Sequence, residues 1–181
     1  MLEWEPDDGS WTVLPREENR SIWDRVNHHL VVDPSRAPTF VEPHDSATWE
    51  ILDIPERPGR TIDQEEVIVG AQLRIALEAI VGADKWLYAL DWQHEGYRFV
   101  PVLAKDPKDS DSWRIPAIPN GDYCLFLAQD LRFGWLGHPW EPTICVYGEL
   151  LVPMTPVLDS MGWPVIRTGR RRRRRRRRRP G

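Results

Sequence analysis

The sequence lacks the features of a membrane-spanning or disulfide-stabilised protein. It has two cysteines in 181 residues, and both Cys124 and Cys145 lie inside apolar runs, where buried free thiols are expected. The longest apolar runs are far shorter than the ~20 residues that a membrane-spanning helix needs. The acidic N-terminal stretch MLEWEPDDGS contains no apolar segment typical of a signal peptide. We therefore expect a cytoplasmic protein.

Short motifs of common catalytic and nucleotide-binding sites are also missing. No G-x-S-x-G turn occurs, and neither cysteine has a base beside it in the sequence. The phosphate-binding patterns G-x-x-x-x-G-K-[ST] and G-x-G-x-x-G are absent. No H-E-x-x-H or paired C-x-x-C occurs either, so the sequence predicts no cofactor and no metal site, and it favours a protein without catalytic activity.

Basic residues are scarce outside one segment, an unbroken run of ten arginines. The run consists of Arg170, Arg171, Arg172, Arg173, Arg174, Arg175, Arg176, Arg177, Arg178 and Arg179. Of the 24 basic residues ten belong to this run, so the rest of the chain has 14 against 28 acidic residues and a formal charge of −14. Such a charge disfavours phosphate-rich partners for the body of the protein and favours cationic ones.

The composition that remains predicts one globular domain with a tail. Ten tryptophans supply large rings that can fill a core or line an interface. We expect a single α+β domain over residues 1–163, with an irregular arm at residues 1–15. Residues 164–181 have charge and little apolar content, which predicts a disordered arginine-rich tail.

The order of the expected elements predicts an α+β fold in which an antiparallel β-sheet packs against two main helices. Apolar residues at helical spacing predict one helix from Arg16 towards Pro34. Thr61 and Gln64 form a capping-box pattern, which predicts a second helix that ends at Gly82.

Strands are predicted at residues 48–54, 86–92, 97–103, 122–128 and 143–151. The second and third of these flank the sequence QHEG and form a β-hairpin pattern. Pro101 would place the third strand at a sheet edge or at a bulge. The last two have apolar residues on both faces of the strand, at odd and at even positions, which is typical of central strands.

The first candidate site is the stretch DWQHE, which places Asp91, His94 and Glu95 around the hairpin loop. A histidine beside carboxylates can act as a general base. The alternative is a loop whose polar side chains form local hydrogen bonds to the backbone, and this interpretation is favoured.

The second candidate site is the stretch GHPWE. His138 and Glu141 would join His94 and Asp91 in one catalytic pocket if the loops after residues 92 and 137 meet at one end of the sheet. These four residues and Asp122 are also the available metal ligands, but their spacing matches no metal motif. The favoured alternative is a structural corner: prolines fix the turn, Trp140 caps the core, and the glutamate is solvated or pairs with an arginine.

Two long segments resemble a known bacterial family. Residues 86–99, WLYALDWQHEGYRF, and residues 119–151, PNGDYCLFLAQDLRFGWLGHPWEPTICVYGELL, are similar to paired motifs of the family named domain of unknown function 2716. Ile22-Trp23-Asp24 and Glu42-Pro43 resemble shorter upstream pieces, so the resemblance covers residues 20–152. The family has no assigned activity, so the resemblance implies that the two motifs belong together and adds no function.

Three functions follow as hypotheses. The leading one is a non-catalytic module that binds a cationic protein through Trp92, Glu95, Asp122 and Trp140, in one version an immunity-like protein that neutralises a basic toxin. The second is a hydrolase with a pocket around His94 and His138. The third is non-specific association of the arginine tail with nucleic acid, for which the alternative is a simple-sequence expansion without function.

Overall fold

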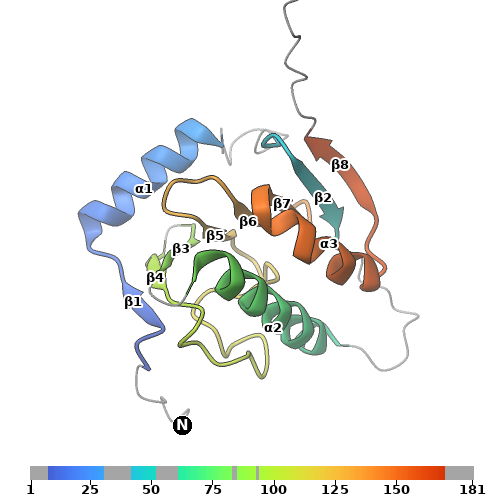
Figure 1. The fold of residues 1–181 in the computed structure, drawn as a ribbon, viewed down its shortest axis with the longest axis horizontal. Helices are drawn as coiled ribbons and strands as arrows, with labels where there is room; N and C mark the ends of the chain where they lie inside the picture. Colours follow the sequence, from blue (N-terminus) through green and yellow to red (C-terminus); the bar gives the residue numbers. More distant parts are fainter. Residues whose placement is uncertain (1–7, 31–41, 52–60, 83–84, 93, 170–181) are drawn as a thin grey trace, which may run out of the picture.

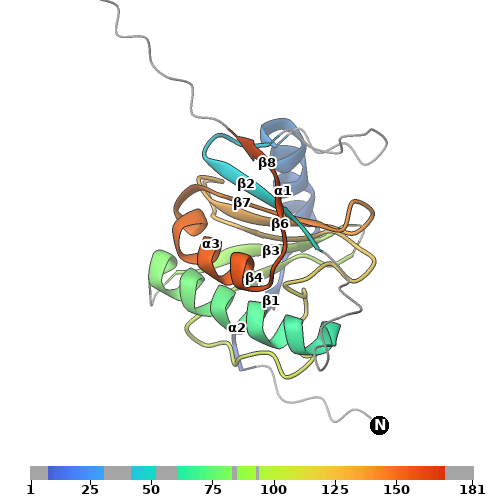
Figure 2. The ribbon, with the colours of Figure 1, turned by 90° about the vertical axis from the view of Figure 1, so that its right-hand side faces the viewer.

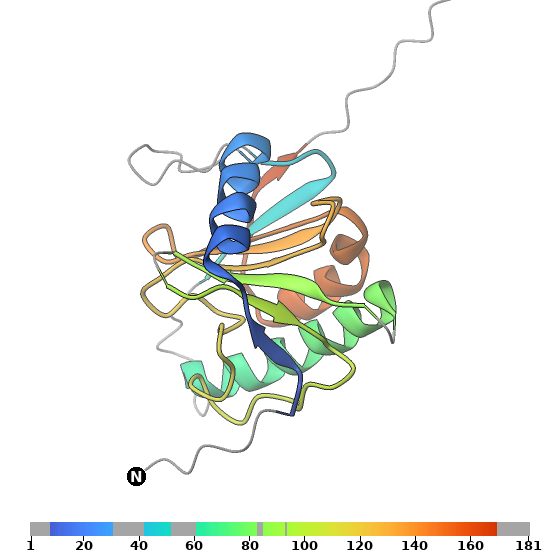
Figure 3. The same cartoon turned by 90° about the vertical axis from the view of Figure 1, so that its left-hand side faces the viewer.

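The computed structural model describes residues 8–30, 42–51, 61–82, 85–92 and 94–169. These residues form a three-layer arrangement in which one β-sheet lies between helices (Figure 1). Helix α1 covers one face of the sheet, and helices α2 and α3 cover the other (Figures 2 and 3). The predicted α+β class with an antiparallel sheet is therefore confirmed, although the structure has one helix more than the sequence predicted.

Helix α1 spans Arg16–His29 and begins directly after Pro15. Pro15 is the N-cap residue, where a missing N–H costs no helical hydrogen bond, and its carbonyl accepts one from the Asn19 N–H at 2.9 Å. Glu17 and Glu18 in the first turn interact favourably with the positive end of the helix dipole. The buried residues of the helix, Ile22 and Val26, contact the sheet, and the other faces of the helix are exposed.

Helix α2 spans Ile62–Val81 and has the predicted capping box. The Thr61 hydroxyl accepts a hydrogen bond from the Gln64 backbone N–H at 3.4 Å, and the Gln64 side chain accepts one from the Thr61 N–H at 3.1 Å. Gly82 follows the last residue with a φ angle of 83°, a conformation that glycine adopts at little cost. Both ends of this helix were therefore predicted correctly.

The sheet has eight strands in the order β1-β4-β3-β5-β6-β7-β2-β8, and every pair is antiparallel. The strands are β1 (Trp11–Val13), β2 (Ser46–Glu50), β3 (Leu87–Asp91), β4 (Tyr97–Phe99), β5 (Cys124–Leu127), β6 (Gly134–His138), β7 (Thr143–Tyr147) and β8 (Val165–Gly169). The predicted strands all coincide with observed ones where the structure describes them, but most are longer than the strands observed. The hairpin around QHEG is formed by β3 and β4.

Alternation along the strands divides the apolar side chains between two cores. The main core lies between the sheet and helices α2 and α3, and it contains Trp49, Trp135 and Phe126. The α1 core lies on the other face and contains Leu90 and Leu136. The buried free thiols were predicted correctly: Cys124 belongs to the main core and Cys145 to the α1 core.

Helix α3 spans Leu151–Ser160 and follows a short 3-10 turn at Gly148–Leu150 (η1). The prediction extended the preceding strand to residue 151, but β7 ends at Tyr147 because Gly148 has a φ angle of 68°. Two prolines concealed the helix in the sequence. Pro153 is in the first turn, where a missing N–H is tolerated, whereas Pro156 lies inside the helix.

Both ends of the described chain contain strands that the sequence did not predict. The predicted irregular arm, residues 1–15, includes β1, whose Trp11 packs against Phe99 with ring centroids 4.2 Å apart. The predicted disordered tail, residues 164–181, includes β8, which pairs with β2. These short strands have too little alternation to be recognised alone and are stabilised by their neighbours in the sheet. Residues 170–181 lie outside the described residues.

Candidate functional site

The candidate residues gather at one end of the sheet. In the strand register Asp91 of β3 pairs with Cys124, Cys124 pairs with Gly137 of β6, and Gly137 pairs with Ile144 of β7. The loops that follow residues 92 and 137 therefore leave the sheet at the same end, two strands or about 10 Å apart. We call this end the rim; its polar and aromatic residues are Asp91, Trp92, His94, Glu95, Asp122, Tyr123, His138, Trp140 and Glu141.

Three rim residues form a compact cluster, which we call the Asp–His–Asp cluster. His94 Nδ1 lies 3.0 Å from Asp91 Oδ2 and 3.7 Å from Asp122 Oδ2. One nitrogen or oxygen atom from each residue lies within 4.8 Å of those of the other two. Asp91 is the last residue of β3, and Asp122 follows the turn at Gly121, whose φ angle is 128°. The pairing of β3 with β5 thus brings together groups that lie 31 positions apart in the sequence.

The Asp91 carboxyl group is the most enclosed member of the cluster. Its side chain is 20% exposed, against 60% for His94 and 47% for Asp122. Its Oδ1 atom is buried and has no hydrogen-bond partner. Burial raises the pKa of Asp91 above its ordinary value, while His94 lowers it and the Asp122 carboxylate raises it to lesser extents.

The loop that carries His94 is held against helix α1. The His94 carbonyl accepts a hydrogen bond from Asn19 Nδ2 at 3.4 Å, and the Gly96 carbonyl accepts one from the Leu14 N–H at 2.8 Å. A β-carbon at position 96 would lie 2.8 Å from a Leu90 methyl group and 2.9 Å from a Leu14 methyl group. It would also lie 2.6 Å from Asn19 Oδ1 of α1. Glycine at position 96 therefore lets the loop approach α1 closely without displacing these side chains.

His138 has a different environment, because it is buried with only 2% of its surface exposed. Its Nδ1 accepts a hydrogen bond from the Glu141 backbone N–H at 3.0 Å, so the proton of the neutral ring is on Nε2, which lies 3.2 Å from the Tyr123 hydroxyl. Burial lowers the pKa of His138, which favours this neutral form. The contacts of His138 therefore match those of a residue that fixes the β6–β7 corner.

Strand alternation places the two histidines in separate groups. Tyr123 and Leu136 belong to the α1 core, and His138, two residues after Leu136, faces the same side of the sheet. Asp91 follows Leu90 of the α1 core, so it faces the opposite side. The loops converge at the rim as the pocket hypothesis required, but His94 lies with the two aspartates and His138 with Tyr123.

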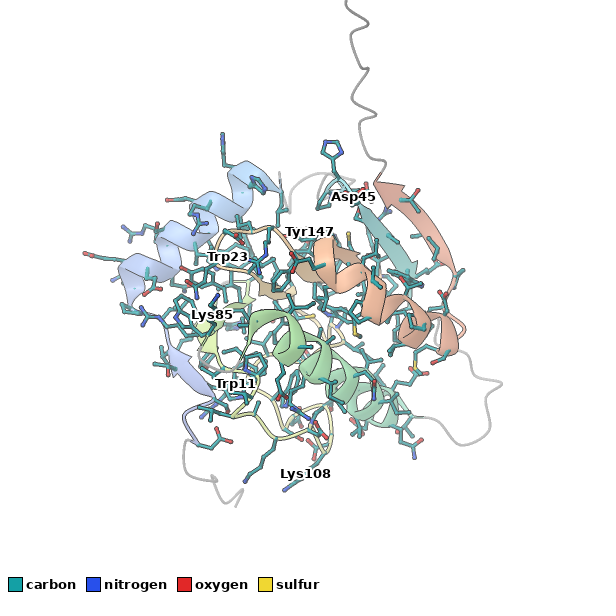
Figure 4. All side chains as sticks on the ribbon, viewed as in Figure 1. Trp11, Trp23, Asp45, Lys85, Lys108 and Tyr147 are labelled. Atoms are coloured by element: carbon teal, nitrogen blue, oxygen red, sulfur yellow. The ribbon has the colours of Figure 1, made fainter. Side chains whose placement is uncertain are left out.

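Aromatic rings connect α1 to the β6–β7 corner in a continuous row. Trp23 meets Trp92 with ring centroids 5.2 Å apart, Trp92 meets Tyr123 at 6.3 Å, and Tyr123 meets Trp140 at 5.8 Å, each edge to face. Trp23 lies on the side of α1 that faces the sheet (Figure 4). Trp140, at the other end, is 67% exposed. We call these four residues the aromatic row.

The positions of Trp140 and Glu141 answer two of the expectations for the structural corner. Trp140 was expected to cap the core, but most of its surface is exposed, because it lies at the tip of the β6–β7 corner beyond the last strand pair. Glu141 was expected to be solvated or to pair with an arginine, and it pairs with Arg167 Nη2 at 2.8 Å. Arg167 belongs to β8 and also contacts Glu42.

Sequence reasoning selected most of the rim as site residues, but it missed Tyr123 of the rim and Trp23 of the aromatic row. Glu95 contacts the Tyr97 hydroxyl at 3.4 Å and does not join the Asp–His–Asp cluster. Tyr123 and Trp23 have conventional core positions in the sequence pattern, and only their ring contacts reveal the aromatic row. Arg170–Arg179 lie outside the described residues.

The fold and the rim define an α+β protein with an antiparallel sheet, helices on both faces and a polar, aromatic site at one end of the strands. The chain belongs to the family described as Protein of unknown function (DUF2716), whose model matches residues 13–152. It is 33% identical over 146 residues to the Uncharacterized protein YxiI of Bacillus subtilis (strain 168), which covers 79% of this chain and 90% of that protein. No solved structure matches the chain.

The family match contains the whole rim, since residues 91–141 lie within residues 13–152. It ends before helix α3 is complete and does not include β8. Among the helices that the structure describes, none has both the length and the apolar character needed to cross a membrane.

Proposed function

We propose that this protein is a binding module that recognises a basic surface of another protein through its rim. The observation that supports this proposal is the aromatic row, which ends in the exposed Trp140. Trp92 and Tyr123 of the row directly follow Asp91 and Asp122 in the sequence, so rings and carboxylates occur together at the rim. Tryptophan is enriched among the few residues that dominate binding energy at protein interfaces. Aromatic faces also attract lysine and arginine side chains directly.

The charges of the rim support a cationic partner. Glu18 and Glu141 are each paired with an arginine, whereas Asp91 and Asp122 are both paired with His94. Their negative charge is therefore less compensated than that of the other paired carboxylates. A negative rim would speed association with a basic partner and select against acidic ones. Neutralisation of a basic toxin, as immunity-type proteins do, is one form that such binding can take.

The hydrolase alternative receives less support from the geometry. A general base needs an accessible nitrogen that can accept a proton, and His138 is buried with its Nδ1 engaged by the Glu141 N–H. The exposed His94 has carboxylate neighbours. A second histidine in that cluster would strengthen the enzyme hypothesis, but the strand alternation directs His138 to the other side.

The proposal is tested in two steps. The immobilised full chain captures a partner from native lysate at low salt, and the affinity of that partner is then measured for purified variants of the chain. Trp140→Ala removes the exposed end of the row, and we expect a loss of about 2 kcal/mol, or roughly 30-fold in affinity. Val152→Ala is the matched control, because Val152 is 80% exposed on α3, away from the rim. Asp122→Asn should reduce the association rate, whereas Asp111→Asn in the 105–112 loop should not.

Two results would contradict the proposal. One is the failure to capture any partner under conditions that retain known weak complexes. The other is a captured partner that binds the Trp140→Ala and Asp122→Asn variants as tightly as the unmodified chain. Either result would remove the rim as a protein-binding surface.

A further inference from the structure

We propose that the Asp–His–Asp cluster is a binding site for a divalent transition-metal cation, with Zn²⁺ as the preferred ion. The ligands would be His94 Nδ1 and one carboxylate oxygen each from Asp91 and Asp122. This proposal goes beyond the protein-binding function. The two share the carboxylates of Asp91 and Asp122, but the metal titration needs no protein partner and therefore tests the ion site separately.

The spacing of the three groups suits a single small cation. Ligand atoms lie about 2.0–2.2 Å from Zn²⁺, so two ligands of one ion are separated by roughly 3 to 4 Å. The separations of His94 Nδ1 from the two carboxylate oxygens are 3.0 and 3.7 Å, and all three ligand atoms lie within 4.8 Å of one another. An ion can therefore be accommodated by small side-chain rotations.

The backbone holds the ligands in place before any ion binds. Asp91 is the last residue of β3 and pairs with Cys124 in the sheet register. Asp122 lies two residues before Cys124. Asn19 of α1 holds the His94 carbonyl at 3.4 Å. Ligands fixed on a rigid scaffold lose little conformational freedom on binding, so the cluster is organised for a ligand rather than assembled by it.

A further observation is the buried Asp91 Oδ1, which has no hydrogen-bond partner. A buried carboxylate oxygen without a partner is unfavourable, and most such atoms in folded proteins are satisfied by a donor, a water or a cation. Two carboxylates beside one imidazole also repel each other in the absence of a positive charge. Asp91 Oδ2, on the same carboxylate, is the oxygen that lies 3.0 Å from His94 Nδ1. A divalent cation bound between these groups would offset the charge of this enclosed carboxylate and remove the repulsion.

The chemistry of the ligands selects the class of metal. An imidazole nitrogen favours Zn²⁺ and its neighbours in the transition series, whereas Mg²⁺ and Ca²⁺ favour sites made of oxygen alone. Three protein ligands leave at least one position open for water or for a group from a bound molecule. The bound ion would also link the hairpin loop that carries His94 to the segment before β5.

The experiment uses the full chain without a histidine tag, treated with a chelator and dialysed. Isothermal titration with ZnCl₂ measures stoichiometry and affinity, and the visible absorption of Co²⁺ reports directly on the ligand set. We expect one ion per chain, and a loss of at least about ten-fold in affinity for His94→Gln and for Asp122→Asn. Titration with MgCl₂ should show much weaker binding.

Matched variants separate this site from other ligands on the surface. Glu95→Gln changes a carboxylate in the same loop that lies outside the cluster, and His28→Gln changes an exposed histidine on α1. Both should keep the unmodified affinity. Circular dichroism of each variant establishes that it is folded, which is expected because His94 and Asp122 are about half exposed or more.

The proposal fails if His94→Gln and Asp122→Asn bind Zn²⁺ as tightly as the unmodified chain. It also fails if His28→Gln removes the binding, since that result would indicate an adventitious ion only. Capture of a partner that is equally strong with and without chelator would support the protein-binding proposal and would show that it does not depend on a metal. The metal-site proposal is decided separately, by the titration.

Discussion

Glu66 shows how one buried side chain connects a helix to a distant loop. It lies in the first half of α2, is 2% exposed, and its two carboxylate oxygens accept hydrogen bonds from the backbone N–H groups of Ala117 and Ile118 at 2.6 and 2.7 Å. Burial raises its pKa to about 7, and the two hydrogen bonds oppose the shift. The residue holds the segment before β5 against the main core.

This raised pKa predicts a specific dependence of stability on pH. The unfolded chain releases the Glu66 proton near its ordinary pKa of 4.5, whereas the folded chain keeps it to about pH 7. The group therefore stabilises the fold below pH 4.5, and this contribution is lost as the pH rises to 7, amounting to about 3 kcal/mol. Glutamine cannot titrate, so the Glu66→Gln variant should lack this part of the pH dependence.

The measurement is the free energy of unfolding in urea at several values between pH 4.5 and 8. Subtracting the values of the Glu66→Gln variant removes the contributions of all other titrating groups. A difference between the two proteins that stays constant across this range would show that the folded-state pKa of Glu66 is not raised.

At the scale of single elements, the pairing of β5 with β6 depends on the absence of a side chain at Gly137. A β-carbon there would overlap with the Cys124 sulfur and lie 3.1 Å from Pro119. We expect Gly137→Ala to lower the free energy of unfolding by about 2 kcal/mol, because added volume in a packed core forces its neighbours apart. The adjacent corner, with His138 and Trp140, would move with the strand.

A compensating substitution at Cys124 provides the control for the contact between positions 137 and 124. Cys124→Ala shortens the opposing side chain, so the double variant with Gly137→Ala should recover part of the lost stability. Thermal unfolding of the two single variants and the double variant gives the coupling energy. Additive losses would show that Gly137 is not constrained by Cys124.

The elements also show which parts of the fold were predictable and which were not. The capping box at Thr61 and the apolar runs of β5 and β7 are local patterns, and local patterns were sufficient to identify α2 and the central strands. Strand β6 was not predicted because glycines at positions 134 and 137 interrupt its sequence, although both are required for close packing.

The rim was predictable as a set of residues but not as an arrangement. The polar positions in DWQHE and GHPWE stood out, since consecutive polar and aromatic residues at strand ends have no role in a core. Strand register and alternation decided the outcome, bringing Asp122 to His94 and directing His138 to Tyr123. These are long-range properties that no short window of sequence contains.

At the scale of the whole molecule, β8 changes how the arginine run can be tested. A chain cut after Trp163 would lose β8 together with the arginines, and with it the contacts of Arg167 to Glu42 and Glu141. A cut after Gly169 removes the run and keeps all eight strands. We expect this shorter chain to melt at an unchanged temperature.

The tail hypothesis predicts that the cut after Gly169 abolishes retention on DNA at low salt, since the guanidinium groups supply the salt-dependent attraction to phosphates. Electrophoretic mobility of a DNA duplex at several salt concentrations measures this. Equal retention of the full and the shortened chain would exclude the tail as the nucleic-acid contact.

The position of β8 has a consequence for where this protein can be divided. Sequence similarity to the family ends at residue 152, but the folding unit continues through α3 and the last strand. A fragment that stops at the family boundary would leave β2 as an open sheet edge, with the buried Trp49 deprived of Asp159, which accepts a hydrogen bond from its indole N–H at 3.0 Å. An edge formed by the largely buried β2 would recruit strands from other chains, so such a fragment should self-associate. A chain that ends at Gly169 has the mostly exposed β8, with the charged Arg167, as its edge and should remain monodisperse.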